Sequence, residues 1–265
     1  MSNSFQNKVI WIIGASSGIG KECALQLAKE GAVLILSSRQ EDKLLEVKKS
    51  ISLPDSHKIL PLDLENLDGV EDRLLDVLGS NKKIDFLFNN GGLSQRSTAF
   101  DTSMDVDRRI MEINYFGNIR LTKMVLPLMR KNGAGHIIVL SSIAGKFGFF
   151  LRSAYSASKH ALHGFYESLR LEEENNNIHV TIACPGKINT DISLNALTGS
   201  GDQHGVMDHN QSTGMGVEEC VRQLLQAVKG QKKEVLIGGK EIKAVTLKRF
   251  FPSLFYKIIK KQPAT

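Results

Sequence analysis

Short apolar runs alternate with longer amphipathic stretches over most of this chain. The apolar runs are strand-sized and cover residues 8–13, 32–38, 58–62, 84–88, 136–140, 179–183 and 234–237. The stretches between them place apolar residues at helical spacing and predict helices at residues 21–31, 41–51, 66–78, 103–130, 155–174 and 218–228. Because strands that alternate with helices form parallel sheets through right-handed crossovers, the pattern predicts an α/β domain with a doubly wound, seven-stranded parallel sheet and helices on both faces.

A glycine-rich turn follows the first apolar run. Gly14, Gly18 and Gly20 are spaced G-x-x-x-G-x-G, and a helical pattern begins directly after them. A strand, a glycine turn and a helix in this order let the backbone approach a pyrophosphate and point a helix N-terminus at it. The spacing differs from the G-x-G-x-x-G of many dinucleotide-binding turns, so a tight turn with close helix–strand packing is the alternative interpretation.

The second apolar run ends at a basic residue. In an NAD-binding fold, the end of this strand carries an acidic residue that binds the ribose 2′-hydroxyl. Here Ser38 and Arg39 occupy that place, and the first carboxylate is that of Glu41. A guanidinium can bind a 2′-phosphate with a forked, charge-assisted contact, so the sequence favours NADP(H). The alternative is that Arg39 is an exposed loop charge.

Tyr155 and Lys159 are the candidate proton-transfer pair. They are four residues apart, which places both side chains on one face of the predicted helix. A lysine beside a tyrosine favours the phenolate and lowers the pKa of the phenol, so that the phenol can exchange a proton during carbonyl/alcohol interconversion. The same spacing also occurs in helices that only bury the ring and expose the lysine.

Two polar residues accompany this pair. Ser142 follows the fifth apolar run, and Asn114 lies on or beside the apolar face of the helix predicted at 103–130. A buried amide needs hydrogen-bonding partners, so a structural role is the alternative for Asn114. Because ligands bind at the carboxyl ends of parallel strands, Ser142 and Tyr155 are expected at the same sheet edge as the glycine turn.

Taken together, these residues resemble the short-chain dehydrogenase/reductase family. The resemblance extends from about Lys8 to Ile237. It rests on motifs that match in order and spacing: Gly14-x-x-x-Gly18-x-Gly20, Asp63, Asn89-Asn90-x-Gly92, Asn114, Ser142, Tyr155-x-x-x-Lys159, and Pro185-Gly186 with Thr190. It implies a single Rossmann-fold domain over residues 1–265, in which residues 8–186 form the cofactor-binding and catalytic core.

The resemblance also implies roles for the matched residues. Tyr155 would be the general acid/base, Ser142 would stabilise charge on the substrate oxygen, and Lys159 would hold the nicotinamide ribose and depress the pKa of Tyr155. Asn114 would hold a water that connects Lys159 to solvent. The implied cofactor-binding residues are Gly14, Ser16, Ser17, Gly18, Ile19, Gly20, Ser38, Arg39, Asp63, Leu64, Asn90, Gly92, Tyr155, Lys159, Pro185, Gly186, Ile188 and Thr190.

Two positions depart from the family's usual pattern. Ile13 stands where a threonine commonly precedes the first glycine, and Gly91 stands where an alanine is common. The missing hydroxyl is expected to remove a cross-link between the first and fourth strands, and the additional glycine to loosen the turn. Neither change touches the catalytic positions.

The composition of the chain argues against a membrane-spanning, secreted, metal-binding or nucleic-acid-binding protein. The 265 residues contain no run that approaches a membrane-spanning length and no signal-peptide pattern. Cys23, Cys184 and Cys220 lack metal-ligand spacing, and His204 and His209 have no matching ligands around them, so we expect reduced thiols, a cytoplasmic location and no metal site. The net charge of +6 is concentrated in the last 35 residues and no nucleic-acid-binding motif accompanies it, which argues against a nucleic-acid partner.

The last third of the chain is its least regular part. Residues 187–216 are polar and glycine-rich and predict a substrate loop that orders on ligand binding. Residues 240–265 form a basic, aromatic extension, in which Phe250, Phe251, Leu254, Phe255, Ile258 and Ile259 interleave with lysines and an arginine. This extension can cap the substrate cleft, contact another subunit or lie on an anionic membrane surface at the periphery.

The sequence therefore predicts an NADP(H)-dependent oxidoreductase that interconverts a carbonyl and a secondary alcohol on a hydrophobic substrate such as a lipid, steroid or retinoid. NAD(H) is the second cofactor that the fold can hold. The alternatives are a ketoreductase of acyl thioesters on a carrier protein and, in another class, a non-catalytic NADP(H)-sensing protein. The resemblance suggests a homodimer or homotetramer through the helices at 103–130 and 155–174.

Overall fold

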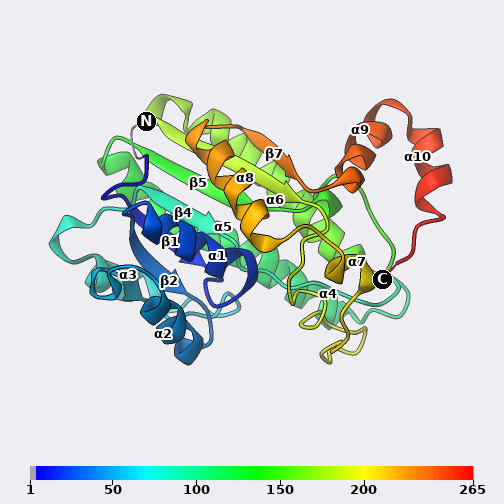
Figure 1. Ribbon diagram of the computed structural model, residues 1–265, viewed down its shortest axis with the longest axis horizontal. Coiled ribbons are helices and arrows are strands. Elements are labelled where there is room, and N and C mark those ends of the chain that lie inside the picture. The colour runs from blue at the N-terminus through cyan, green and yellow to red at the C-terminus, as the bar shows by residue number, and fades with distance from the viewer. Residues whose placement is uncertain (1–3, 265) are drawn as a thin grey trace.

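Seven parallel strands form one sheet in the order β3-β2-β1-β4-β5-β6-β7, which confirms the predicted fold class (Figure 1). The computed structural model describes residues 4–264. Its strands are β1 (Val9–Ile13), β2 (Val33–Ser37), β3 (Lys58–Ile59), β4 (Phe86–Asn89), β5 (Gly135–Leu140), β6 (Ile178–Pro185) and β7 (Glu234–Ile237). Ile13 at the end of β1 is level with Ser37 of β2 and Asn89 of β4, so three carboxyl ends share one edge.

Helices cover both faces of this sheet. They are α1 (Gly18–Lys29), α2 (Glu41–Ser50), α3 (Val70–Leu78), α4 (Met104–Met111), α5 (Gly117–Lys131), α6 (Ser153–Glu172), α7 (His209–Ser212), α8 (Val217–Lys229), α9 (Lys243–Phe250) and α10 (Pro252–Ile259). Successive residues of a strand point to opposite faces. Accordingly, Ile10 and Ile12 of β1 pack under α1, α2 and α8, whereas Trp11 and Ile13 pack under α3, α5 and α6.

The stretch predicted as one helix at 103–130 is interrupted. A π-helical turn, Glu112–Phe116, separates α4 from α5 and contains Asn114. Gly117 follows this turn and lies so close to the segment after β3 that a Cβ atom on it would be 2.7 Å from the backbone oxygen of Leu64. Such single-turn π-bulges widen a helix locally and are frequent at functional sites. Sequence periodicity did not reveal the interruption, because apolar residues continue through it at near-helical spacing.

The strand order reverses between β1 and β4, which are neighbours in the sheet. The glycine turn leaves β1 at this point, and Asn90–Gly92 leave β4 beside it. A reversal of this kind opens a crevice beyond the carboxyl ends of the strands, which is where ligands bind in open α/β sheets.

The segment at 187–216 is anchored to the body of the protein. It contains the short helix α7, a parallel bridge between Gln95 and Leu197, and buried side chains including Ser193 and Asp208. The sequence pattern did not predict α7. Whether the segment changes on ligand binding stays a prediction.

The C-terminal extension forms α9 and α10, which stand at one end of the molecule (Figure 1). The chain then returns toward α7, where the Asn210 side chain donates a 3.3 Å hydrogen bond to the carbonyl of Pro263. Arg152 donates a 2.6 Å hydrogen bond to the carbonyl of Ala264. The extension is therefore attached to the body at both of its ends.

Candidate functional site

A pocket of about 910 Å³ opens at the carboxyl edge of the sheet. Its wall contains ten of the residues predicted from the sequence: Ile19, Asn90, Gly92, Ser142, Tyr155, Lys159, Pro185, Gly186, Ile188 and Thr190. The other predicted residues lie outside this wall: Gly14, Ser16, Ser17, Gly18, Gly20, Ser38, Arg39, Asp63, Leu64 and Asn114. The structure thus brings the predicted proton-transfer residues and one half of the predicted cofactor set into a single cavity.

The glycine turn forms a tight cradle beneath this edge. Gly14 and Gly18 have φ values of +74° and +50°, which favour glycine, and a Cβ atom on Gly20 would lie 2.1 Å from the backbone oxygen of Gly14. Ser17 is the N-cap residue of α1, and its hydroxyl makes no capping hydrogen bond. A backbone without side chains at the N-terminus of a helix fits the pyrophosphate of a dinucleotide.

The turn after β4 is bonded to this cradle. Asn90 donates a 3.1 Å hydrogen bond from its side chain to the carbonyl of Gly14. A Cβ atom on Gly91 would lie 2.6 Å from Leu64 Cδ1 and 3.2 Å from Ile13 Cγ2. The two departures from the family pattern, Ile13 and Gly91, are therefore packed against each other, since the isoleucine side chain fills space beside the glycine.

The residues predicted at the adenosine end lie at the ends of β2 and β3. The Arg39 side chain is exposed and makes no hydrogen bond or ion pair with any of residues 4–264. Ser38 Oγ accepts a hydrogen bond from the backbone of Gln40, and Asp63 Oδ1 accepts one from the backbone of Glu65. An unpaired guanidinium beside the strand end leaves its donors available for a phosphate.

Tyr155 is buried in the pocket wall, with 8% of its surface exposed. Burial raises the pKa of its phenol, whereas hydrogen bonding with Ser142 and the charges of Arg96 and Arg152 act in the opposite direction. Burial dominates, and the positive charges that oppose it belong to the two arginines, whereas the expected lowering of this pKa by Lys159 stays a prediction. Lys159 Nζ lies 5.7 Å from the centre of the Tyr155 ring.

Lys159 is fixed at the end of β5. Its Nζ donates a 2.7 Å hydrogen bond to the carbonyl of Leu140, and its side chain is buried. Burial lowers the pKa of Lys159 to about 8. A buried ammonium with one protein partner retains two further N–H donors that can bind a ligand in the pocket.

Asn114 lies behind the pocket wall and is fully buried. Its Oδ1 accepts a 2.7 Å hydrogen bond from the backbone of Leu93, and its Nδ2 donates to the Leu93 carbonyl and to Ser158 Oγ. A Cβ atom on Gly92 would come within 3.4 Å of both Asn114 Oδ1 and Lys159 Nζ. The side chain therefore positions Gly92 and Leu93 beside Lys159, and its predicted role in holding water stays a prediction.

Three charged residues of the site were not predicted from the sequence. Arg96 and Arg152 line the pocket with Tyr155, and both donate to Oδ2 of Asp208 at distances between 2.5 and 2.8 Å. The side chains of Arg96 and Asp208 are 2% and 1% exposed. They approach from segments 112 residues apart, so no local sequence pattern could reveal the cluster. The single local indication was that Arg152 directly precedes the helix of Tyr155.

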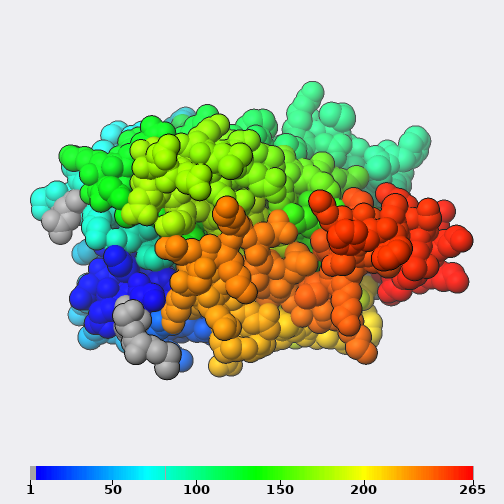
Figure 2. All heavy atoms as spheres, turned by 90° about the horizontal axis from the view of Figure 1, so that it is seen from above, coloured from blue at the N-terminus to red at the C-terminus, as the bar shows by residue number. Residues whose placement is uncertain are grey.

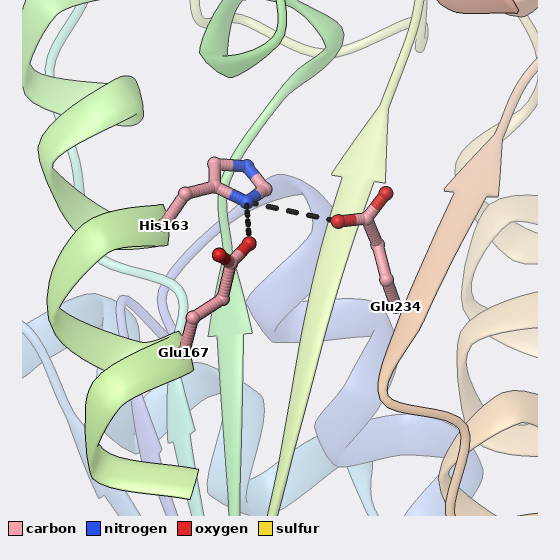
Figure 3. A group of neighbouring side chains, drawn as sticks. All are labelled: His163, Glu167 and Glu234. Atoms are coloured by element: carbon pink, nitrogen blue, oxygen red, sulfur yellow. Dashed lines mark ion pairs between the residues drawn. The ribbon is translucent and has the colours of Figure 1, made fainter. Parts of the chain in front are cut away.

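A second cluster of titratable side chains connects α6 with β7 outside the pocket (Figure 3). His163 Nδ1 lies 3.5 Å from Glu167 and 3.7 Å from Glu234, the first residue of β7. These three side chains could offer ligand atoms to a metal ion. The ammonium of Lys146, however, already contacts both His163 Nδ1 and the Glu234 carboxylate, so we assign no metal to this group.

The C-terminal extension supplies part of the pocket wall. Leu247, Phe251, Phe255 and Ile259 line it, and Phe255 packs edge-on against Phe147 with ring centres 5.1 Å apart. These side chains give the mouth of the pocket an apolar lining. Three roles were expected for the extension. In the structure it caps the cleft, which is one of the three.

The fold and the site define a nucleotide-dependent oxidoreductase of the Rossmann type. The sequence pattern of the short chain dehydrogenase family matches residues 8–199, and the chain belongs to this family.

Named relatives agree with this assignment. The chain is 40% identical to "Dehydrogenase/reductase SDR family protein 7-like" of Drosophila melanogaster over 98% of its own length and 82% of that relative. It is 41% identical to "Dehydrogenase/reductase SDR family member 7B" of Xenopus laevis, over 96% of this chain and 81% of that relative.

Solved structures share the same architecture. A short-chain dehydrogenase from Streptomyces avermitilis superposes with a TM-score of 0.80 at 25% identity over 96% of both chains. A short chain dehydrogenase from Burkholderia cenocepacia, solved in complex with NADP, superposes with a TM-score of 0.79 at 22% identity over 98% of this chain and 99% of that one. A relative from Burkholderia phymatum was solved with NAD, with a TM-score of 0.81 at 20% identity over 98% of this chain and 97% of that one. At these lower identities the likeness concerns the fold.

Proposed function

We propose that this protein is an NADP(H)-dependent oxidoreductase that interconverts a carbonyl and a secondary alcohol on a hydrophobic substrate. The observation that carries this proposal is the wall of one pocket, in which Tyr155, Ser142 and Lys159 meet beneath an apolar mouth. The glycine turn opens toward the same sheet edge and fits a dinucleotide.

Each of these residues has a distinct task. A nicotinamide nucleotide, when bound, would supply the hydride for the carbonyl carbon of the substrate or take it up from the alcohol. Tyr155 gives its proton to the substrate oxygen during reduction and takes it back during oxidation, while the Ser142 hydroxyl bonds to the same oxygen. Lys159, which is held by the Leu140 carbonyl, has N–H donors left that would hold the ribose of the nucleotide. Arg96 and Arg152 stabilise the phenolate that is left on Tyr155.

The preference for NADP(H) rests on Arg39. Its guanidinium is exposed, and no acidic residue lies at the end of β2. Replacement of Arg39 by Gln should raise the KM for NADPH about tenfold or more and leave the KM for NADH nearly unchanged, because only the former carries a 2′-phosphate. An Arg39→Gln variant with an unchanged ratio of the two KM values would show that this residue does not select the cofactor.

The hydrophobic substrate class rests on the lining of the pocket mouth. Phe147, Phe149, Leu247, Phe251 and Phe255 contribute side chains to it. Burial of apolar substrate surface against such a wall is favourable by about 25 cal/mol per Å². A panel of alkyl and aryl ketones of increasing size, followed by NADPH absorbance, should give kcat/KM values that rise with apolar surface.

The Tyr155→Phe variant separates an enzyme from a non-catalytic nucleotide sensor. NADPH binding, measured by fluorescence titration, should persist, while turnover should fall by about 100-fold or more because the proton donor is gone. Tyr115→Phe is the matched control, since Tyr115 is half-buried and lies outside the pocket wall, where its ring packs against Phe116 and Phe165. Full turnover in Tyr155→Phe would overturn the mechanism.

A further inference from the structure

The outer surface of α9 and α10 carries an unusual set of exposed apolar side chains. Phe250 is 65% exposed, Phe251 62%, Leu254 48% and Ile258 43%. We name these four residues the tail patch. Leu254 and Ile258 are one helical turn apart in α10, so they lie on the same face of that helix. Figure 2 shows that this C-terminal segment occupies one end of the molecule.

The tail patch is continuous with the mouth of the substrate pocket. Phe251 and Ile258 are exposed and also belong to the pocket wall, whereas Phe250 and Leu254 lie outside it. Phe150, which is 45% exposed, follows the pocket residue Phe149 and packs on its ring. Apolar side chains of the tail patch therefore belong both to the outer surface and to the wall of the cavity.

Positive charge surrounds this apolar surface. Residues 240–265 contain seven lysines and arginines and one acidic residue, so this extension alone carries +6, the net charge of the entire chain. Lys257, Lys260 and Arg249 are exposed next to the tail patch. None of the three forms an ion pair with a carboxylate among residues 4–264.

We propose that the tail patch docks onto an anionic lipid bilayer, with the mouth of the pocket facing the membrane interior. An apolar face rimmed by lysines and arginines is the composition of interfacial helices, whose apolar side chains enter the acyl boundary while the bases contact anionic headgroups. A second copy of this chain is disfavoured as the occupant, because two such extensions would bring six surplus positive charges each into one interface. No helix in the described part of the chain is long and apolar enough to cross a bilayer.

Vesicle flotation of the full chain with NADPH tests this docking. The protein should float with phosphatidylcholine vesicles that contain about 30% phosphatidylserine, float much less with pure phosphatidylcholine, and be released by about 0.5 M salt. The double variant Phe250→Ser/Leu254→Ser should reduce partitioning at least about tenfold and retain turnover of a water-soluble ketone, since neither residue lines the pocket. Lys257→Gln/Lys260→Gln should remove most of the preference for anionic lipid.

The matched control is Leu53→Ser/Leu171→Ser, which removes two leucines that are 73% and 74% exposed elsewhere on the surface. This variant should float as the wild type does. The proposal is overturned if the wild type stays unbound with anionic vesicles, or if the tail-patch variant floats as well as the wild type. It is also overturned if the wild type sediments as a dimer that Phe250→Ser/Leu254→Ser dissociates while vesicle binding is absent.

Discussion

Arg152 donates a 2.8 Å hydrogen bond to the carboxylate oxygen of Asp208 that also binds Arg96. Two buried positive charges thus share one negative charge, and the surplus lies in the wall of the pocket that contains Tyr155. The cluster joins three parts of the chain: the segment after β4, the start of α6 and the irregular segment at 187–216. It therefore connects the shape of this pocket with the electrostatics of Tyr155, the proposed proton donor.

Loss of Asp208 should destabilise the fold. The variant Asp208→Ala leaves two buried guanidinium groups without their counter-charge, and removal of one partner of a buried ion pair costs about 3–5 kcal/mol. Urea unfolding at pH 7 measures the difference. The control is Asp202→Ala, an exposed aspartate of the same segment, for which we expect a change below about 1 kcal/mol. Equal effects of the two variants would show that the cluster contributes no stability.

Arg152 should set the pH range of oxidation. In the proposed mechanism the phenolate of Tyr155 accepts the proton in that direction, so the rate should rise with pH through the pKa of Tyr155. Burial raises this pKa, and the positive charge of Arg152 is one of the factors that lower it. Arg152→Gln should therefore move the rise in kcat to higher pH by about one unit, and Arg152→Lys should restore part of the shift.

The control for this profile is the reduction of a carbonyl at low pH, where Tyr155 is protonated in all variants. If Arg152→Gln lowered kcat equally at every pH, its effect would be structural, and the proposed electrostatic role would be wrong.

The buried ammonium of Lys159 should lower the free energy of unfolding of the protein, although the proposed turnover requires this residue. The pKa of Lys159 in the folded protein, about 8, lies below the value of about 10.4 for an unfolded lysine. Below pH 8 the lysine is charged in both states, so the full free-energy cost of burying the ammonium lowers the stability of the fold. Lys159→Met should be more stable than the wild type at pH 7 by about 2 kcal/mol, after allowance for the lost hydrogen bond to Leu140, and it should lack turnover.

The extra stability of Lys159→Met over the wild type should shrink between pH 8 and about 10.4. In this range the lysine is neutral in the folded wild type but still charged in the unfolded chain, so the cost of burying the charge disappears. Urea unfolding at pH 7 and pH 9 gives the comparison. Lys43→Met in the exposed part of α2 should show no such pH dependence. A Lys159→Met variant that is less stable at pH 7 would contradict the prediction.

Gly20 should be indispensable for nucleotide binding. An alanine there would place its Cβ atom 2.1 Å from the backbone oxygen of Gly14, so the cradle would have to open. Gly20→Ala should weaken NADPH binding at least about tenfold, as measured by titration calorimetry. Gly164→Ala in α6 is the matched control, because its added Cβ meets no atom within 4 Å, and it should raise the free energy of unfolding by about 0.5–1 kcal/mol.

The predictable part of the site follows from short segments of sequence. Tyr155 and Lys159 share a helix face because of their spacing, and Ser142 stands at a strand end because an apolar run stops before it. The ends of parallel strands lie at one edge of a sheet, so motifs from distant segments were correctly expected to meet there. The unpredicted part depends on contacts across the fold. Asn114 lies in a π-helical turn, and the positive charges that act on the Tyr155 phenol come from Arg96 and Arg152.

The sequence by itself determined the seven-stranded parallel sheet, the position of the glycine turn and the shared helix face of Tyr155 and Lys159, the candidate proton-transfer pair. Periodicity and short motifs express these features, because each depends on residues that are close along the chain. The tertiary structure alone decided how deeply Tyr155 is buried, which charges surround it, and that α9 and α10 form the mouth of the pocket. Burial and the distances between charges determine pKa values, and both arise only when segments more than a hundred residues apart pack together.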